Sequence, residues 1–318
     1  MPTVGWIRVF GSLEGNDMAS NTAAANGLSR FLSDLGHSFR IFLRNLTRNK
    51  VGFVGTLMIL GFIFLAFIMP YFVPAPHKAD ITKIYERPSR EHLLGTDSQG
   101  KDIWAQIVHG GRDIVVMAFL TGMIATFIGV SLGSLSAVIG GPLDSFLTTL
   151  ADVWLTIPRF PLLAVLAGLI TLNNIITLAL ILAVLSWAGL YRAIRAQVFS
   201  IKERDYIEAA TALGLGLRHI IFSEILPNMM AYIAINFTLA MTAAIYAQVG
   251  LVFLGLVPLT RNWGVMINLA WTQGAIFFRD SIYFIMAPVV AIALFQLSIV
   301  WMSRSLEEIF NPRLRAGR

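Results

Sequence analysis

The chain has 318 residues, of which 56% are hydrophobic and 13% are charged, and its mean hydropathy is +0.72. Ordinary soluble domains contain fewer hydrophobic and more charged residues, so the composition predicts an integral membrane protein. The absence of cysteine excludes disulfides, thiolate metal sites and cysteine nucleophiles. The net charge of +6 does not indicate nucleic-acid binding, because the basic residues lie in loops beside apolar segments, where they act as topology signals.

The first 52 residues are expected to precede the first span. Residues 1–27 are rich in Ala, Asn, Ser and Gly and predict a flexible cytoplasmic leader to which no function is assigned. In residues 28–52, apolar side chains recur at helical spacing with arginines between them, which predicts an amphipathic helix along the inner membrane surface. No signal peptide is visible, because the first apolar run begins after Lys50 and is already long enough to span.

Six apolar segments predict membrane-spanning helices, since about 20 apolar residues cross a hydrocarbon core of about 30 Å. They are residues 53–72, 114–139, 161–172, 175–191, 229–256 and 282–302. The third segment is short, so its helix is expected to begin within 147–157 and to kink at Pro158 or Pro161. The spans form one domain, 53–303, which a basic tail, 304–318, follows.

Loop charges predict the orientation of the spans. If the N-terminus is inside, sixteen Lys and Arg, with Arg159 among them, fall in inner segments and eight fall in outer segments. Both termini are therefore expected in the cytoplasm of a multi-pass inner-membrane or plasma-membrane protein. Loop 73–113 would then lie outside and segment 201–227 inside.

The outer loop 73–113 is too long for a simple turn and is expected to pack as an external cap. Within it, Gly95-Thr-Asp-Ser-Gln-Gly100-Lys101 matches a phosphate-binding loop up to the last position, where Asp102 replaces Ser or Thr. Asp97 and Asp102 would repel phosphate, and the lead-in is polar rather than a buried strand. We therefore interpret this segment as a glycine turn before a helix.

The cores of the predicted spans contain no charged residue or histidine. This disfavours an ion-coupled carrier, and it disfavours an intramembrane enzyme that needs a base, a metal or a carboxylate pair. Thr238, Thr242 and Tyr246 share one helix face at i, i+4 and i+8. Interhelical hydrogen bonding is the favoured interpretation of this stripe, and pathway lining is the alternative.

Segment 201–227 is polar, helix-competent and flanked by spans. Good helix formers run from Glu203 to Leu213, and Gly214 and Gly216 are expected to end that helix. A second helix from about Leu217 then leads into the fifth span. The small alanines would let a partner surface approach closely, whereas an interfacial elbow without a partner is the alternative.

Several motifs, taken in their order along the chain, resemble those of one protein family. Glu208-Ala209-Ala210, Gly214 and the distal Leu226-Pro227 resemble the EAA motif of ABC importer permeases. From about residue 28 to the C-terminus, further landmarks are similar to permeases of dipeptide and oligopeptide importers, the inner-membrane components of binding-protein-dependent transport systems. These landmarks are His92-Leu-Leu-Gly-Thr-Asp97 with Gly100-Lys-Asp102, Phe253-Leu-Gly-Leu256, Trp263-Gly264 and Asn311-Pro-Arg-Leu-Arg315.

The resemblance implies an all-α type I ABC importer permease that forms half of the pathway for peptides or similar small solutes. It implies no catalytic residue and no metal site in this chain, with ATP and Mg bound by separate ATPase subunits. The implied partners are a sister permease, two ATPases, an extracytoplasmic substrate-binding protein and the lipid bilayer. A stand-alone channel or ion-coupled carrier, or a membrane anchor for other proteins, is the alternative.

The candidate site residues fall into three groups. The residues implied to couple to the ATPases are Tyr206, Glu208, Ala209, Ala210, Gly214, Leu226 and Pro227. The candidate pathway residues are Thr238, Thr242 and Tyr246. The external-loop signature comprises Gly95, Thr96, Asp97, Gly100 and Asp102.

Overall fold

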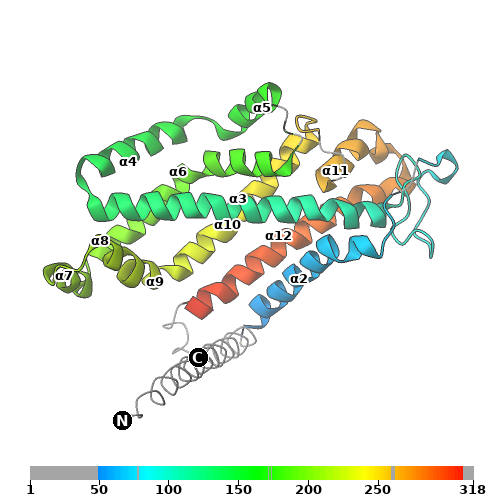
Figure 1. Ribbon diagram of the computed structural model, residues 1–318. Coiled ribbons are helices and arrows are strands. Elements are labelled where there is room, and N and C mark those ends of the chain that lie inside the picture. Colours follow the sequence, from blue (N-terminus) through cyan, green and yellow to red (C-terminus); the bar gives the residue numbers. More distant parts are fainter. Residues whose placement is uncertain (1–48, 77–78, 171, 173, 259–261, 311–318) are drawn as a thin grey trace, which may run out of the picture. The chain divides into compact units, whose positions relative to one another are not determined.

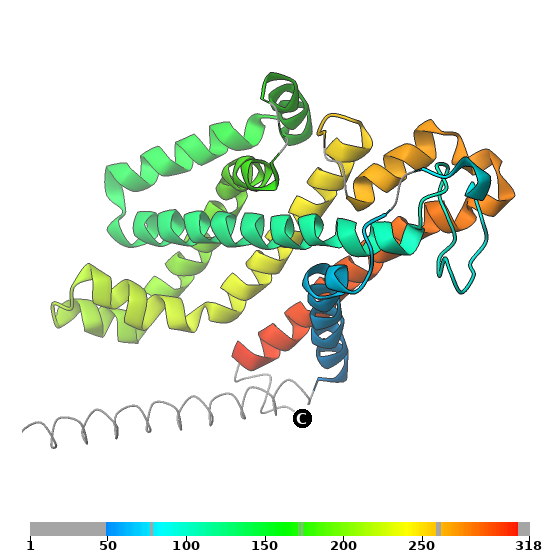
Figure 2. The same ribbon diagram turned by 45° about the vertical axis from the view of Figure 1, so that its right-hand side comes forward.

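A computed structural model describes residues 49–76, 79–170, 172, 174–258 and 262–310, and it is helical throughout its ordered elements (Figures 1 and 2). The predicted leader, nearly all of the predicted amphipathic helix and the end of the basic tail lie outside the described residues. The chain divides at Lys50 into two units, and the following description concerns the second, Val51–Arg318. Its α-helices are α2 (Lys50–Phe67), α3 (Ile103–Ile139), α4 (Gly141–Thr156), α5 (Arg159–Leu169), α6 (Ile175–Lys202), α7 (Asp205–Ala212), α8 (Leu217–His219), α9 (Leu226–Asn228), α10 (Met230–Phe253), α11 (Trp263–Thr272) and α12 (Ile282–Phe310).

Short helical turns join these helices. The 3-10 turns are η1 (Met69–Tyr71), η2 (Ile81–Lys83), η4 (Ala275–Phe277) and η5 (Arg279–Ser281), and η3 (Ile220–Ile225) is a π-helix. Within the described residues the only β pairing is an isolated bridge between Thr96 and Asp102. The all-α prediction is confirmed.

Five helical segments are long and apolar enough to cross a membrane, and α4 with α5 forms a sixth span if the bent pair is counted as one. The two helices of that pair meet at 81°, and Pro158 stands directly before α5. The expected kink is therefore found at Pro158. Pro158 cannot donate a backbone hydrogen bond, and Thr156 before the break ends α4.

The second span begins earlier than predicted. Helix α3 starts at Ile103, because the side chain of Asp102 accepts a hydrogen bond from the Ala105 amide and caps the helix. The external loop is correspondingly shorter than 73–113, and its last eleven residues are the first three turns of α3. With 37 residues, α3 is about 55 Å long.

Helices α3 and α6 pack at very short range. A Cβ atom at Gly129 would lie 2.6 Å from Leu190 Cβ, and one at Gly133 would lie 3.0 Å from the Tyr191 carbonyl oxygen. Small residues four positions apart commonly let membrane helices approach until their backbones touch. Figures 1 and 2 both show α4 folding back from the end of α3 to run beside this pair.

A second core forms around Trp263 of α11. Its indole Nε1 donates to the Ile107 carbonyl oxygen of α3 at 2.9 Å, and the side chain is fully buried. The ring contacts Phe62 of α2 and Phe295 of α12 at centroid distances of 6.0 and 6.4 Å. This tryptophan therefore joins four helices at the end of the molecule that carries the 79–102 loop.

We predict that Gly129→Val destabilises the chain by about 1–3 kcal/mol, because the added side chain must push α6 away from α3. The measurement is the thermal midpoint of the purified protein in mild detergent. Gly189→Ala on α6 is the matched control, since a Cβ there meets no atom within 4 Å. Equal midpoints for the two variants would contradict the close contact.

Candidate functional site

Helix α7 is the core of the predicted coupling segment. Asp205 and Glu208 lie in its first turn, where the helix dipole stabilises negatively charged side chains. Its end is set by Gly214, which has φ +73°, a left-handed conformation that a side chain would strain. The Leu215 amide then donates back to the Ala210 carbonyl oxygen at 3.1 Å, which closes the helix. The prediction that Gly214 ends the first helix is confirmed.

The two faces of α7 differ in exposure. Ile207 and Ala210 are buried, at 2% and 6% exposed. Tyr206 is 43% exposed, and Leu213 just beyond the helix is 78% exposed. The expectation that Ala210 offers a close approach to a partner is therefore corrected, because its side chain faces the protein's own bundle.

Glu208 lies on the outer part of α7. Its side chain is exposed, and within the described residues no hydrogen bond or ion pair holds its carboxylate. It borders, with Thr211, a cavity of about 490 Å³ that Lys202 and Glu203 also line. Glu208 therefore makes no contact that caps its own helix, and the carboxylate is free to meet another chain.

The buried face of α7 is attached to the spans through one apolar cluster. This cluster joins α7 to α3, α6 and the helical turns before α10, through Ala137, Ile194, Val198, Ile201, Ile207, Ile220, Ile225 and Met229. Lys202, at the end of α6, donates to the carbonyl oxygens of Ala137 and Val138 in α3 at 3.2 Å each. A displacement of α7 therefore acts directly on the ends of α3 and α6.

The predicted second helix is built from three short helical elements of two kinds. It comprises α8, the π-helix η3 and α9, and it carries the chain from Gly216 to Asn228. Pro227, on α9, lacks an N–H, and in a regular α-helix its ring would clash with the carbonyl group four residues earlier. That carbonyl group belongs to the π-helix η3, whose wider turn makes room for the ring. Leu226 packs against the apolar cluster under α7, whereas Pro227 is exposed.

The three candidate pathway residues do not share one environment. Thr238 is buried, and its hydroxyl donates to the Ile235 carbonyl oxygen of its own helix at 2.7 Å. Thr242 is half-buried, and its carbonyl oxygen accepts from the Gln296 amide of α12 at 3.4 Å. Tyr246 is 63% exposed. The stripe thus combines a local hydrogen bond, a contact between helices and a single outward-facing side chain.

The external-loop signature forms a folded cap. The Asp97 side chain is buried, and its Oδ1 accepts from the amides of Gln99 and Lys101 at 2.7 and 2.9 Å. Its Oδ2 accepts from the Gln106 side-chain amide at 2.8 Å. The hydroxyl of Thr96 accepts from the Glu86 amide at 2.8 Å and donates to the Lys83 carbonyl oxygen.

Two glycines let the cap close on itself. Gly95 and Gly100 both have positive φ, and a Cβ at either would lie 2.3 Å or less from a carbonyl oxygen, of Glu86 and of Asp80. Asp102 caps α3 and also contacts His92 Nδ1 at 2.8 Å. This segment is the glycine turn before a helix that the sequence predicted, and its carboxylates bind the protein's own amides and His92.

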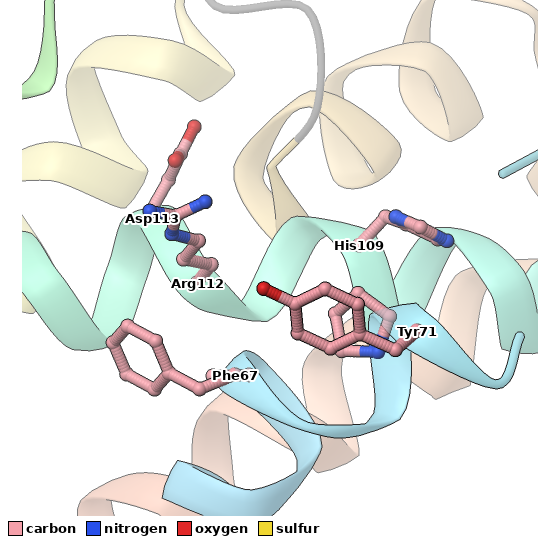
Figure 3. A pocket seen from close by; sticks show the side chains of 7 residues that line it. Phe67, Tyr71, His109, Arg112 and Asp113 are labelled. Carbon is pink, nitrogen blue, oxygen red and sulfur yellow. The ribbon is translucent and has the colours of Figure 1, made fainter.

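A cavity of about 540 Å³ lies beside this cap, between the end of α2 with η1 and the start of α3. Figure 3 shows Phe67 and Tyr71 opposite His109, Arg112 and Asp113 of α3. The Arg112 guanidinium lies 5.8 Å from the centre of the Phe67 ring. About 40 Å of helix follow Arg112 to Ile139, so α3 is long enough to hold both residues outside a hydrocarbon core of about 30 Å.

The prediction that the span cores lack charge is wrong in the third span, whereas the charges of α6 lie beyond the predicted end of the fourth span at residue 191. Arg195 of α6 donates through Nε and Nη2 to the two carboxylate oxygens of Asp144 in α4, at 2.5 Å each. Ser136 of α3 also donates to Asp144, and Tyr191 of α6 bonds Thr148 of α4 at 3.0 Å. These polar contacts join α4 to α3 and α6 near their ends beside α7.

Arg159 is the second correction. It begins α5, and its Nη2 donates to the Ser186 hydroxyl in the middle of α6 at 2.7 Å, so it belongs inside the third span rather than in an inner loop. The sequence carried a signal for this position, since Arg159 stands between Pro158 and Pro161 in an apolar stretch too short to span. The partnership of Asp144 and Arg195 had no such signal, because 51 residues separate them.

Comparison with known proteins agrees with this arrangement. Residues 129–316 match the family described as the binding-protein-dependent transport system inner membrane component. Residues 38–88 match the N-terminal TM domain of oligopeptide transport permease C.

Individual relatives cover most of the chain. A protein of Brucella suis whose name describes a peptide permease is 30% identical over 84% of this chain and 88% of its own. The dipeptide transport system permease protein DppC of Bacillus subtilis is 32% identical over 71% of each chain. The oligopeptide transport system permease protein OppC of the same organism is 27% identical over 93% of this chain and 96% of its own.

The helices and the matches together define a multi-span membrane permease. The chain belongs to the family of inner membrane components of binding-protein-dependent transport systems. The resemblance seen in the order of the sequence motifs is thereby confirmed, and a transport component is supported over a stand-alone channel or carrier.

We predict that Gly214→Ala opens the end of α7, because alanine in the left-handed region costs about 1–2 kcal/mol. Hydrogen exchange of the Leu215 amide should become about tenfold faster or more. Gly214→Asn should show a smaller effect, since asparagine tolerates this conformation better. Gly216→Ala is the control, because Gly216 has φ −64° and an added Cβ there would meet no atom within 4 Å. If Gly216→Ala accelerated exchange of the Leu215 amide as much as Gly214→Ala, the interpretation would be contradicted.

We predict that Asp97→Ala lowers the stability of the cap by about 2–4 kcal/mol, because it leaves two backbone amides and the Gln106 amide without an acceptor. Protease sensitivity of the 79–102 loop in the detergent-purified protein measures the loss. Asp97→Asn retains an acceptor and should be less affected. A cap as resistant in Asp97→Ala as in the parent chain would show that these bonds do not hold it.

Proposed function

We propose that this chain forms half of the translocation pathway of an ATP-driven importer for peptides or similar small solutes. Family membership supports the transport role, and the names of the dipeptide and oligopeptide permease relatives support the solute class. Hydrolysis belongs to separate ATPase subunits, which bind ATP and Mg. This chain needs no cofactor of its own for that role.

The observation that carries the coupling assignment is the two-faced α7. Its buried face is part of the cluster that includes α3 and α6, while Tyr206, Glu208, Ala209 and Leu213 are exposed. An exposed side chain as large as Leu213 beside a carboxylate is typical of a surface that another protein covers. We infer that an ATPase subunit docks on this face.

The proposed orientation places α7 in the cytoplasm together with both termini. Loop charges support it, and moving Arg159 out of the inner set leaves the inner excess intact. The 79–102 cap then faces the extracytoplasmic side, where a substrate-binding protein delivers the solute. The sister permease faces outward-facing residues such as Tyr246 across the pathway and completes it.

The proposed coupling follows from the contacts of α7. When the ATPases close, α7 moves with them, and its apolar cluster carries the ends of α3 and α6. The Asp144–Arg195 pair transmits the same movement to α4. Access to the pathway therefore changes between the two sides as the ATPases cycle.

We predict that Leu213→Cys crosslinks to an ATPase subunit when the complex is treated with a short heterobifunctional reagent, whose first end reacts with the thiol and whose second end inserts into neighbouring residues on photolysis. The chain has no cysteine of its own, so the introduced thiol is the only one in this subunit. Ile81→Cys is the matched control, because Ile81 is 81% exposed but lies on the opposite end, in the cap. Equal yields from the two positions would overturn the assignment of α7.

Leu213→Ser should weaken ATPase binding by about tenfold or more, if this side chain lies at the centre of the interface. The measurement is the salt concentration that strips the ATPases from the complex, together with solute-stimulated ATP hydrolysis. Phe222→Ser on η3 removes a comparably exposed apolar side chain, at 64%, outside the docking face. Undiminished binding in Leu213→Ser would remove this residue from the interface.

A further inference from the structure

Arg159 places a guanidinium group at membrane depth. The group reaches Ser186, which stands eleven residues after the start of α6 at Ile175 and nine residues before Arg195. At 1.5 Å per residue these separations are about 16 Å and about 14 Å along the helix. Arg159 therefore lies near the middle of a hydrocarbon core of about 30 Å.

The charge of Arg159 is not neutralised within the described chain. Its Nε is buried without a hydrogen-bond partner. Its one acceptor, Ser186, is neutral and donates its own proton to the Leu182 carbonyl oxygen at 2.5 Å. The two carboxylates of α4 each have another arginine, since Asp144 pairs with Arg195 and Asp152 lies 3.5 Å from Arg192.

A cation at this depth is costly unless it faces an anion or water. A lipid phosphate is too far away, because headgroups lie outside the hydrocarbon core, roughly 15 Å from its middle. The third span is interrupted between α4 and α5, and membrane proteins tolerate such interruptions where the backbone lines a water-filled cavity. These facts favour an aqueous pathway over a lipid-facing position.

The surroundings of Arg159 connect it with the candidate pathway residue on α10. A Cβ at Gly250 would lie 3.2 Å from the Phe160 ring, so the start of α5 contacts this face of α10. Tyr246 is four residues before Gly250 and therefore shares that face. Tyr246 is also the exposed member of its stripe, which places an outward-facing phenol one helical turn from the contact between α5 and α10.

We propose that Arg159 binds the carboxylate of the transported solute as it passes the broken third span. The inference rests on the proposed function. One Nη2 hydrogen is held by Ser186, and the other Nη2 hydrogen with Nη1 forms the planar fork that matches a carboxylate. A single cation beside one neutral hydroxyl attracts an anionic group without trapping it, as passage through a membrane requires.

The test measures electrostatic attraction at Tyr246→Cys, the only thiol in this otherwise cysteine-free chain, in the complex with its sister permease and ATPases. Two methanethiosulfonate reagents of similar size are compared, one with an anionic sulfonatoethyl group and one with a cationic trimethylammonium-ethyl group. The ratio of the anionic to the cationic labelling rate should fall about tenfold on Arg159→Gln. Arg159→Lys should keep most of the ratio, because it keeps the charge.

Arg192→Gln is the matched control, since it removes an exposed arginine from α6 and should change the ratio less than about twofold. Leu239→Cys, 59% exposed and seven residues earlier on the same helix, replaces the reporter if Tyr246→Cys does not assemble. An unchanged ratio in Arg159→Gln overturns the inference, because the charge would then be neutralised by another chain. Failure of both reagents to label either reporter also overturns it, because the surface would not be aqueous.

The proposed function is tested separately in the same preparations by ATP hydrolysis in response to the binding protein. Stimulated hydrolysis with an unchanged labelling ratio removes only the role of Arg159. A complex that contains no ATPase removes the proposed function itself.

Discussion

The close contact between α3 and α6 is the constraint on which the rest of the structure depends. Gly129 and Gly133 let the two backbones approach to a distance that any larger residue would prevent. Because α6 is held there, Arg195 reaches Asp144 and Lys202 reaches the last carbonyls of α3. The polar contacts at this end of the bundle are thus consequences of a packing contact.

The same contact explains why the proposed coupling segment is firmly attached to the bundle. Ile207 and Ala210 pack inward, so the short α7 is not an independent arm but an extension of the paired helices. Only its outer residues remain for another protein. Within the eight residues of α7 the fold therefore separates a buried face from an exposed one, and Gly214 ends the helix just beyond them.

Much of this arrangement could be predicted from the sequence, and the exceptions have physical causes. Apolar length predicted the spans, Pro158 predicted the break, and the conformational demands of Gly214 predicted the end of α7. Loop length did not predict the start of α3, because an N-cap side chain, Asp102, sets it within a polar stretch. Burial of Ala210 was missed because alanine is equally suited to both faces of a short helix.

The partners of the charged residues were not predicted, for a different reason. Hydropathy treats each residue alone, whereas Asp144 and Arg195 are tolerated only because the fold brings them together. The pairing is a tertiary property. Arg159 is a different case, because the prolines on both sides of it indicated an unusual position in the sequence. Its partner could not be predicted, since Ser186 lies in the next span.

Helix α3 is capped at both ends by side chains, by its own N-cap residue Asp102 and by Lys202 of α6. With a length of about 55 Å it extends well beyond a hydrocarbon core of about 30 Å. Such a helix acts as a lever: a tilt of about 5° around one end displaces the other by about 5 Å. The 79–102 cap therefore lies at one end of this helix and the α7 cluster packs against the other, so a tilt of α3 about its middle moves the two regions in opposite directions.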